Sequence, residues 1–143
     1  MAGKKLIPNQ ISMLDFAIIS GSIDNPVEHD YTLVNDHNYQ VNFNMTYDLK
    51  EKMVKSDIKI EIKTKSKKGQ VKEASGNFHI AYLFKVENLN ELVDETGSIG
   101  FELGNAISSI SYSTSRGIIM TRFQGTALSN FILPIIDPNE LLK

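Results

Sequence analysis

Apolar side chains occupy every second position from Tyr39 to Tyr47, and polar side chains occupy the positions between them. A period of two places successive side chains on opposite faces of a strand, so this stretch predicts a half-buried strand. The alternation recurs from Ile58 to Ile62, with charged residues on the outer face, and from Phe78 to Val86. Residues 13–23 are apolar in both alternate sets, which is typical of a strand covered on both faces. The pattern therefore predicts four successive strands.

A helix is predicted after the fourth strand because the spacing changes. Isoleucine or threonine recurs there at steps of three and four, at Ile107, Ile110, Thr114 and Ile118. This spacing places them on one stripe of a helix. Serines and Gly117 fill most positions between them, whereas a helix with a solvent-facing side more often carries Lys and Glu. We expect the helix to pack on two sides, against the sheet and against a second surface such as another subunit; a helix with a merely serine-rich outer face is the alternative.

An extended apolar segment is predicted after this helix. Gly125 can adopt the positive φ that often ends a helix. Large apolar residues follow it closely, at Leu128, Phe131, Ile132, Leu133, Ile135 and Ile136. Pro134 and Pro138 exclude a continuous helix and disfavour a central strand. Such a segment is expected to cover the core or to wall a groove, because it would promote aggregation if it were left exposed.

The predicted fold class is α+β. Strands joined by short turns leave no room for the crossovers of a parallel sheet, so the sheet is expected to be antiparallel and to be followed by one long helix. A chain of 143 residues suits one domain, and residues 1–143 are expected to form it. The 41% apolar and 22% charged residues are typical of a globular protein.

Composition and charge exclude several classes of protein. The chain has no cysteine, which removes disulfides and thiolate chemistry and fits a reducing compartment, so the cytoplasm is the expected location. Residues 1–12 hold no apolar stretch of signal-peptide length, and no run of apolar residues is long enough to predict a membrane span. A net charge of -2 is too small for a protein that binds nucleic acid through its overall charge. The lysines before Gly69 are expected to form a solvated hairpin tip, with contact to phosphate or an acidic partner as the alternative.

No residue pattern predicts catalysis, a metal or a cofactor. The glycines from Gly97 to Gly104 do not form a phosphate-binding fingerprint. The histidines stand at positions 29, 37 and 79, too far apart to indicate a metal site. The helix serines lack the glycine-flanked elbow of a hydrolase nucleophile. The carboxylates between Glu87 and Gly100 are expected in a solvated loop, where docking a basic partner is a better interpretation than acid–base catalysis.

The C-terminal part of the sequence resembles a known family. The helix runs into Arg122-Phe123-Gln124-Gly125-Thr126, and an apolar run around Pro134 extends from Phe131 to Asp137. This order resembles the SecB export chaperones, in which a long helix ends at Gly-Thr, an extended crossover loop follows, and an apolar Leu-Pro run leads into a last helix. Upstream, only the order and character of the strands agree with that family. The resemblance implies a four-stranded antiparallel sheet, a long helix, an extended crossover loop and a short C-terminal helical stub that begins at Asn139.

The resemblance also implies a function. SecB-like proteins are holding chaperones that work without ATP and bind non-native chains in apolar grooves walled by the sheet and the crossover loop. Unfolded client polypeptides are therefore the implied partners. Carried over by motif, the groove wall comprises Phe123, Leu128, Phe131, Leu133 and Ile135. Strand character alone adds Phe43, Met45, Phe78 and Ile80 to this set.

Oligomeric state and biological role follow from the resemblance less directly. SecB-like proteins are usually homotetramers, built as dimers of dimers, with the long helices in the subunit contacts. The stripe of Ile107, Ile110, Thr114 and Ile118 is therefore the expected oligomer interface. The acidic face by which export members bind the SecA motor has no residue-by-residue match in this sequence. Protein export thus stands beside an alternative role, the protection of an antitoxin or another single partner.

Overall fold

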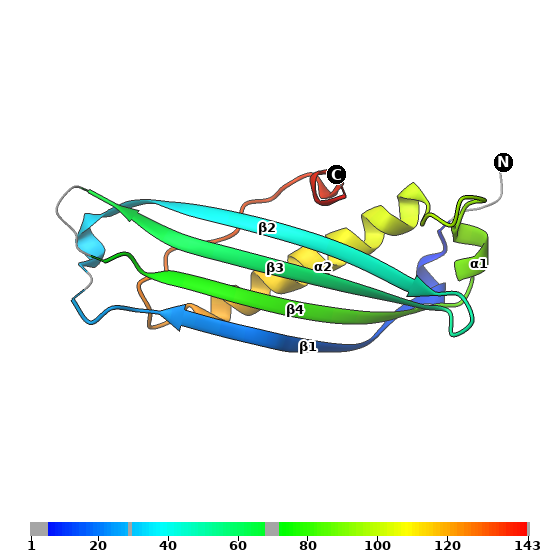
Figure 1. Cartoon of the computed structure of the whole chain (residues 1–143), viewed down its shortest axis with the longest axis horizontal. Coiled ribbons are helices and arrows are strands. Elements are labelled where there is room, and N and C mark those ends of the chain that lie inside the picture. Colours follow the sequence, from blue (N-terminus) through cyan, green and yellow to red (C-terminus); the bar gives the residue numbers. More distant parts are fainter. Residues whose placement is uncertain (1–5, 29, 68–71, 143) are drawn as a thin grey trace.

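The computed structural model describes residues 6–28, 30–67 and 72–142, and one antiparallel sheet forms its main layer (Figure 1). The sheet order is β1-β4-β3-β2, and each neighbouring pair is antiparallel. The strands are β1 (Ile11–Asp24), β2 (Val34–Asp48), β3 (Met53–Ser66) and β4 (Ser75–Val86). The short 3-10 turns η1 (Pro8–Gln10) and η2 (Tyr31–Leu33) precede β1 and β2. The predicted four-stranded sheet is confirmed, although each strand is longer than its sequence pattern indicated.

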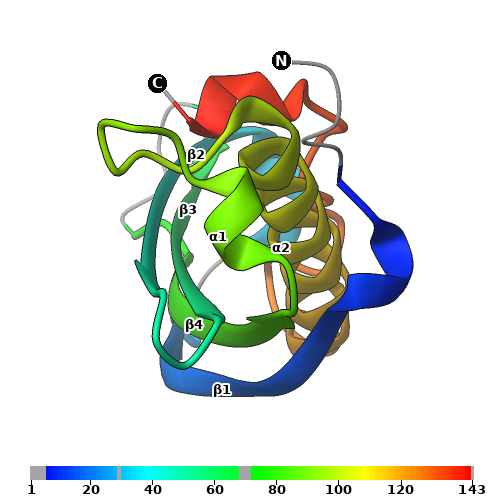
Figure 2. The same cartoon turned by 90° about the vertical axis from the view of Figure 1, so that its right-hand side faces the viewer.

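One long helix, α2 (Phe101–Arg122), follows the sheet as predicted. The sheet curves around α2, which lies on its concave side (Figure 2). Between β4 and α2, where the sequence predicted a loop, lie the short helix α1 (Leu89–Leu92) and a β-bridge between Val93 and Ile99. The chain closes with the 3-10 turn η3 (Pro138–Leu141), which corresponds to the predicted helical stub. Among the described residues, no helix is both long enough and apolar enough to cross a membrane.

Alternate side chains of the two central strands build the core against α2. Val54, Ile58 and Ile60 of β3 and Ile80 and Phe84 of β4 are buried, and the charged residues between the β3 isoleucines, Lys59 and Glu61, are exposed. The charged outer face predicted for β3 is therefore confirmed. The predicted lysine-rich hairpin tip lies partly outside the described residues, which omit positions 68–71.

Buried serines bring α2 close to the sheet. The Ser111 and Ser56 hydroxyls hydrogen-bond to each other at 2.7 Å, and the Ser115 hydroxyl hydrogen-bonds to the Tyr82 hydroxyl at 2.7 Å. Ser108 is also buried, and its hydroxyl donates a hydrogen bond to a carbonyl of the preceding helical turn. Because each of these hydroxyls has a partner, the helix brings polar groups into the core without leaving them unsatisfied. Much of the serine content of α2 therefore belongs to the side that faces the sheet, which the sequence pattern could not assign.

The end of α2 has the predicted geometry. Gly125 has a φ of 79°, in the region that a side chain disfavours, and the Thr126 hydroxyl donates a 2.7 Å hydrogen bond to the Phe123 carbonyl. The chain therefore leaves the helix within one turn and continues in a new direction.

Strand β1 differs from its prediction as a strand covered on both faces. It is an edge strand, and its pairing with β4 shifts register between Met13 and Asp15 and between Ile18 and Ser20. Phe16 is 50% exposed, Ile19 is 56% exposed, and Met13 and Leu14 are exposed as well. The prediction is wrong for the single chain because an edge strand with two bulges turns several apolar side chains away from the core.

We expect Ser111→Ala to lower the free energy of unfolding by about 1–3 kcal/mol, because it leaves the buried Ser56 hydroxyl without its partner. The double variant Ser56→Ala/Ser111→Ala removes both hydroxyls and should lose less stability than the single variant. Urea denaturation at one fixed protein concentration measures both values. Ser113→Ala, an exposed position on the same helix, is the control and should change stability by less than about 0.5 kcal/mol. A Ser111→Ala variant as stable as the unmodified protein would contradict the role of this pair.

Candidate binding site

Residues 127–137, here called the crossover segment, lead from the end of α2 towards the β2 side of the molecule and η3 (Figure 1). The part from Phe131 to Asp137 has no regular secondary structure, and Pro134 favours its extended conformation. Phe131 and Leu133 are buried, whereas Ile132 is 50% exposed and Ile135 is 85% exposed. The crossover segment thus presents one apolar side to the core and another to solvent.

Most residues predicted to form a groove wall lie in the core. Those that are buried are Phe123, Leu128, Phe131, Leu133, Phe78 and Ile80. Phe43 and Met45 of β2 are partly buried against the same core, and Ile135 alone of this set is largely exposed. The fold therefore brings the predicted residues together, but most of them support the crossover segment from beneath and offer little surface of their own.

A glycine of β4 makes room for this packing. Gly76 is buried, and a Cβ at this position would lie 3.1 Å from Leu128 Cδ1 and 3.3 Å from Phe123 Cε1. The Phe123 ring also meets the Phe78 ring edge-on, with centroids 5.8 Å apart. Because protein interiors are close-packed, a larger residue at position 76 would push the start of the crossover segment away from the sheet.

Contacts with β2 and with α2 hold the part of the crossover segment from Phe131 to Pro134. The Phe131 ring packs against the rings of His37 and Tyr39 in β2, with centroid distances of 5.0 and 5.6 Å. Burial lowers the pKa of His37, against an opposing effect of the Asp36 charge, so this ring is an uncharged partner at neutral pH. The Tyr112 hydroxyl of α2 donates a 2.6 Å hydrogen bond to the Pro134 carbonyl. The crossover segment is therefore fixed both to β2 and to α2.

The main chain of the crossover segment keeps unused hydrogen-bonding groups. Within the described residues, no hydrogen bond is formed by the N–H groups of Ile132, Leu133, Ile135 and Ile136. Backbone N–H groups need a partner, which water or another chain can supply. An extended segment with free main-chain groups is the arrangement to which a second extended chain pairs.

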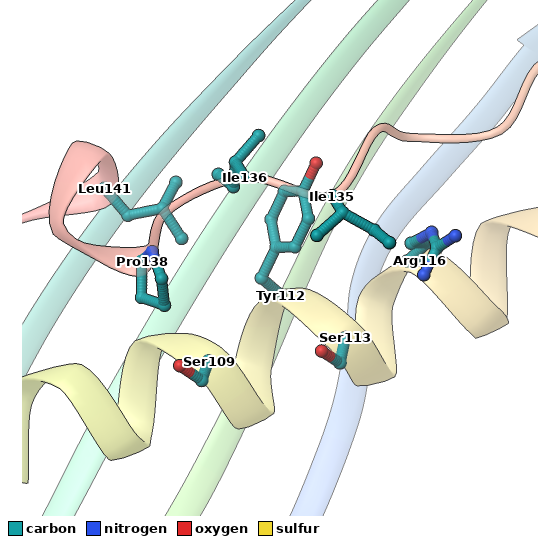
Figure 3. Close-up of a pocket in the computed structure, with 8 residues that line it drawn as sticks. All are labelled: Ser109, Tyr112, Ser113, Arg116, Ile135, Ile136, Pro138 and Leu141. Carbon is teal, nitrogen blue, oxygen red and sulfur yellow. The ribbon is translucent and has the colours of Figure 1, made fainter.

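An open pocket of about 200 Å³ lies between the crossover segment and α2 (Figure 3). Its lining residues are Ser109, Tyr112, Ser113, Arg116, Ile135, Ile136, Pro138 and Leu141. The helix contributes the polar groups, whereas the crossover segment and η3 contribute aliphatic ones. Pockets that enclose whole small molecules usually measure about 300–1,000 Å³. This pocket is better suited to side chains of a longer ligand.

Arg116 brings an uncompensated positive charge to the pocket. Its Nε atom is buried without a hydrogen-bond partner, and its side chain forms no ion pair within the described residues. Leaving such an atom unsatisfied costs about 1–3 kcal/mol. Burial raises the pKa of Tyr112 to about 12, with a further contribution from Tyr39 and an opposing one from Arg116. Tyr112 therefore stays neutral and provides no negative charge for Arg116.

Sequence reasoning missed this polar side of the pocket. Arg116 is the only charged residue of α2 between Glu102 and Arg122, and Tyr112 precedes it by one helical turn. A single charge within an otherwise uncharged stretch of the helix was a usable signal. The aliphatic half of the pocket is distant in sequence, and only the fold brings it to Arg116. Within the described residues, no three His, Asp or Glu side chains are grouped to hold a metal ion.

The predicted oligomer interface lies on the other flank of α2. Ile107 is fully buried, Ile110 is 38% exposed, and Thr114 and Ile118 are partly buried. Helical geometry places Ile110, Thr114 and Ile118 roughly opposite the pocket residues of α2. β1 is the edge strand farthest from β2, to which Phe131 attaches the crossover segment. The exposed apolar residues of β1 and this flank of α2 therefore lie on the side of the molecule away from the pocket.

A comparison with solved structures identifies a protein of similar fold. The chain aligns with the Mycobacterium tuberculosis Rv1957 SecB-like chaperone, which was solved in complex with a ChAD peptide from the Rv1956 HigA1 antitoxin. The TM-score is 0.64 at 14% sequence identity, and the alignment covers 90% of this chain and 92% of that chain. This chain has a SecB-like fold.

Other comparisons add little to the SecB-like fold. No family model matches the chain, and no curated protein matches it in sequence. A protein of unknown function from Streptococcus agalactiae aligns over 87% of this chain and 97% of its own, at 10% identity, but its TM-score is only 0.34. The similarity to the SecB-like chaperone therefore shows the fold alone. The chemistry of the site follows from this chain's own residues.

We expect Tyr112→Phe to loosen the crossover segment, because it removes the hydrogen bond to the Pro134 carbonyl. Amide hydrogen exchange at residues 131–137 should become faster, and the free energy of unfolding should fall by about 0.5–1.5 kcal/mol. The control is Tyr39→Phe, because the Tyr39 hydroxyl forms no hydrogen bond within the described residues. Unchanged exchange in Tyr112→Phe would show that this bond does not hold the segment.

The effect of Tyr112→Phe on stability should depend on pH. The pKa of Tyr112 is raised to about 12 in the folded chain, so its proton stabilises the fold fully below the unfolded value of about 10. That stability is lost as the pH rises from about 10 towards 12. The stability difference between the unmodified protein and Tyr112→Phe should therefore shrink over this interval, which denaturation at stepped pH values measures.

Proposed function

We propose that this chain is an ATP-independent holding chaperone that binds segments of non-native polypeptide along the crossover segment. The observation that supports the proposal is the combination of exposed apolar side chains, free main-chain N–H groups and an adjoining open pocket in a SecB-like fold. A chaperone has to accept many sequences, so its site needs apolar area and main-chain partners more than pockets shaped for particular side chains. The crossover segment offers both.

The predicted site residues take different parts in this proposal. Ile135, with its exposed neighbour Ile132, contacts the client directly. Phe123, Leu128, Phe131 and Leu133 hold the crossover segment on the core, and Phe78 and Ile80 form the floor beneath them. Phe43 and Met45 complete this support on the β2 side. Burial of exposed apolar surface contributes about 25 cal/mol per Å² before the costs of association are subtracted.

A second candidate is a dedicated chaperone for one partner, such as an antitoxin. The observation that favours it is the similar SecB-like chaperone solved with an antitoxin peptide. The two candidates differ in selectivity. A dedicated chaperone should retain one strong partner from an extract of its own cells and protect unrelated unfolded proteins poorly, whereas a general holdase should show the reverse. A general holdase would act in the cytoplasm, and a role in protein export through the SecA motor belongs to this first candidate.

We expect the purified protein to suppress aggregation of a chemically unfolded protein diluted from denaturant, with no nucleotide present. Ile135→Ser should need about 3- to 10-fold more protein for half-suppression, because it removes most of an exposed apolar contact. Light scattering measures both effects. The matched control is Val27→Ser, since Val27 is fully exposed in a loop outside the site. The proposal fails if the unmodified protein gives no protection at excess chaperone.

We also propose that a second copy of the chain covers the β1 side, as the first step of a dimer-of-dimers assembly. β1 is an unpaired sheet edge with exposed Met13, Leu14, Phe16 and Ile19, and Ile110 adds apolar surface from α2. An unprotected apolar edge of this kind promotes association. A second copy bound to the β1 side would leave the pocket open.

Phe16→Asp should shift the protein to a species of lower mass, because it places a charge in the middle of this apolar edge. Light scattering coupled to size-exclusion chromatography measures the mass. Leu49→Asp is the control, since Leu49 is similarly exposed in the turn between β2 and β3. An unmodified protein that is monomeric at all concentrations would overturn the assembly.

A further inference from the structure

Arg116 is the one charged residue among those that line the pocket, and a purely apolar peptide would leave its charge without an acceptor. Its Nε atom is buried without a partner, and no acidic side chain pairs with it within the described residues. The remaining polar lining consists of neutral hydroxyls, on Ser109, Ser113 and Tyr112. The buried Nε–H group of this half-buried side chain requires an acceptor, which a ligand or water can supply here.

We propose that Arg116 selects client segments in which an Asp or Glu side chain stands next to a large apolar residue. The carboxylate binds at the Arg116 end of the pocket, and the apolar neighbour packs on Ile135. This inference rests on the proposed chaperone function and adds a chemical preference to it.

The chemistry of the guanidinium favours a carboxylate. Arginine offers planar pairs of N–H donors that match the two oxygens of a carboxylate, and such charge-assisted hydrogen bonds are stronger than neutral ones. The aliphatic side chains of Ile135, Ile136 and Leu141 line the same pocket, and a bound client would cover part of its opening. Reduced solvation strengthens the attraction between the two charges.

The apolar neighbour follows from the position of Ile135. Figure 3 shows Ile135 beside Arg116, with both side chains between the crossover segment and α2. Ile135 is 85% exposed in the single chain, so an apolar client side chain has surface to cover there. A client with a carboxylate alone would leave this surface in water, and one with an apolar residue alone would leave Arg116 without an acceptor.

The geometry favours a side chain within a longer segment over the carboxylate at a chain end. The crossover segment continues past Arg116 in Figure 3, and its free N–H groups lie at Ile132 and Leu133 as well as at Ile135 and Ile136. An extended client can therefore pair with the main chain on both sides of its acidic residue. A chain end would use only one of these stretches.

The test uses pairs of short fluorescent peptides with both ends blocked. Each pair shares the same apolar residues and differs only in a central Glu or Gln. The unmodified protein should bind the Glu peptide about 5- to 10-fold more tightly, as expected for one charge-assisted contact. Fluorescence anisotropy measures both dissociation constants. The preference should weaken as salt is raised, because screening acts on the charged pair.

Variants separate Arg116 from the rest of the site. Arg116→Met keeps an aliphatic stem of similar length, and it should bind both peptides with the affinity that the unmodified protein has for the Gln peptide. Arg116→Lys should restore part of the preference, which a purely structural role of Arg116 would not predict. The control is Arg122→Met, which removes the same charge from an exposed position in the last turn of α2 and should leave the preference unchanged.

The outcomes distinguish this inference from the function on which it rests. If the unmodified protein binds neither peptide of any pair and protects no client, the chaperone function itself fails. Equal binding of Glu and Gln peptides, or an equal preference in Arg116→Met, would overturn carboxylate recognition while client binding stands. A third peptide with a free C-terminal carboxylate and no Glu should bind like the Gln peptide. Tighter binding of that peptide than of the Glu peptide would assign the site to chain ends and overturn the inference.

Discussion

The crossover segment can be exposed and still hold its shape because every second side chain near its centre is buried. Phe131 and Leu133 point into the core, so the intervening Ile132 is held in solvent on a fixed backbone. Phe123 and Leu128 anchor the start of the segment over Gly76, where a side chain would be crowded. An apolar surface that is fixed in this way binds a partner without first losing conformational entropy, which is a large part of the cost of association.

The position of α2 determines which helix side chains line the pocket together with the crossover segment. Hydrogen-bonded serines on its sheet side allow a close approach to β3 and β4, and Tyr112 on its neighbouring side reaches the Pro134 carbonyl. One further turn along that side stands Arg116. The pocket therefore combines a rigid helix with an extended segment. Its single charge sits on the rigid partner, where the orientation of the guanidinium can be maintained.

The sequence predicted the helices and strands better than it predicted which residues pack against one another. Alternation in β2, β3 and β4 identified the strands because each has one buried and one solvated face. In β1 the same reasoning failed, because the sequence does not show that β1 is an edge strand whose two register shifts turn apolar side chains away from the core. The crossover segment was recognisable from Gly125, Pro134 and the apolar run, but periodicity cannot tell which of its residues are buried. Arg116 was not predicted as a site residue, because the residues that complete its pocket are distant in sequence and approach it only in the folded chain.

The two apolar surfaces of this chain differ in their polar content. The β1 side consists of an unpaired strand edge with several adjacent exposed apolar residues, which suits a permanent partner such as a second copy. The pocket side includes hydroxyls and Arg116, and it is bordered by free N–H groups. Exchangeable ligands favour such mixed surfaces, because they can supply partners to the polar groups while they cover the apolar ones. Since α2 separates the two sides, assembly through β1 would leave the pocket accessible, and one chain can use both surfaces at once.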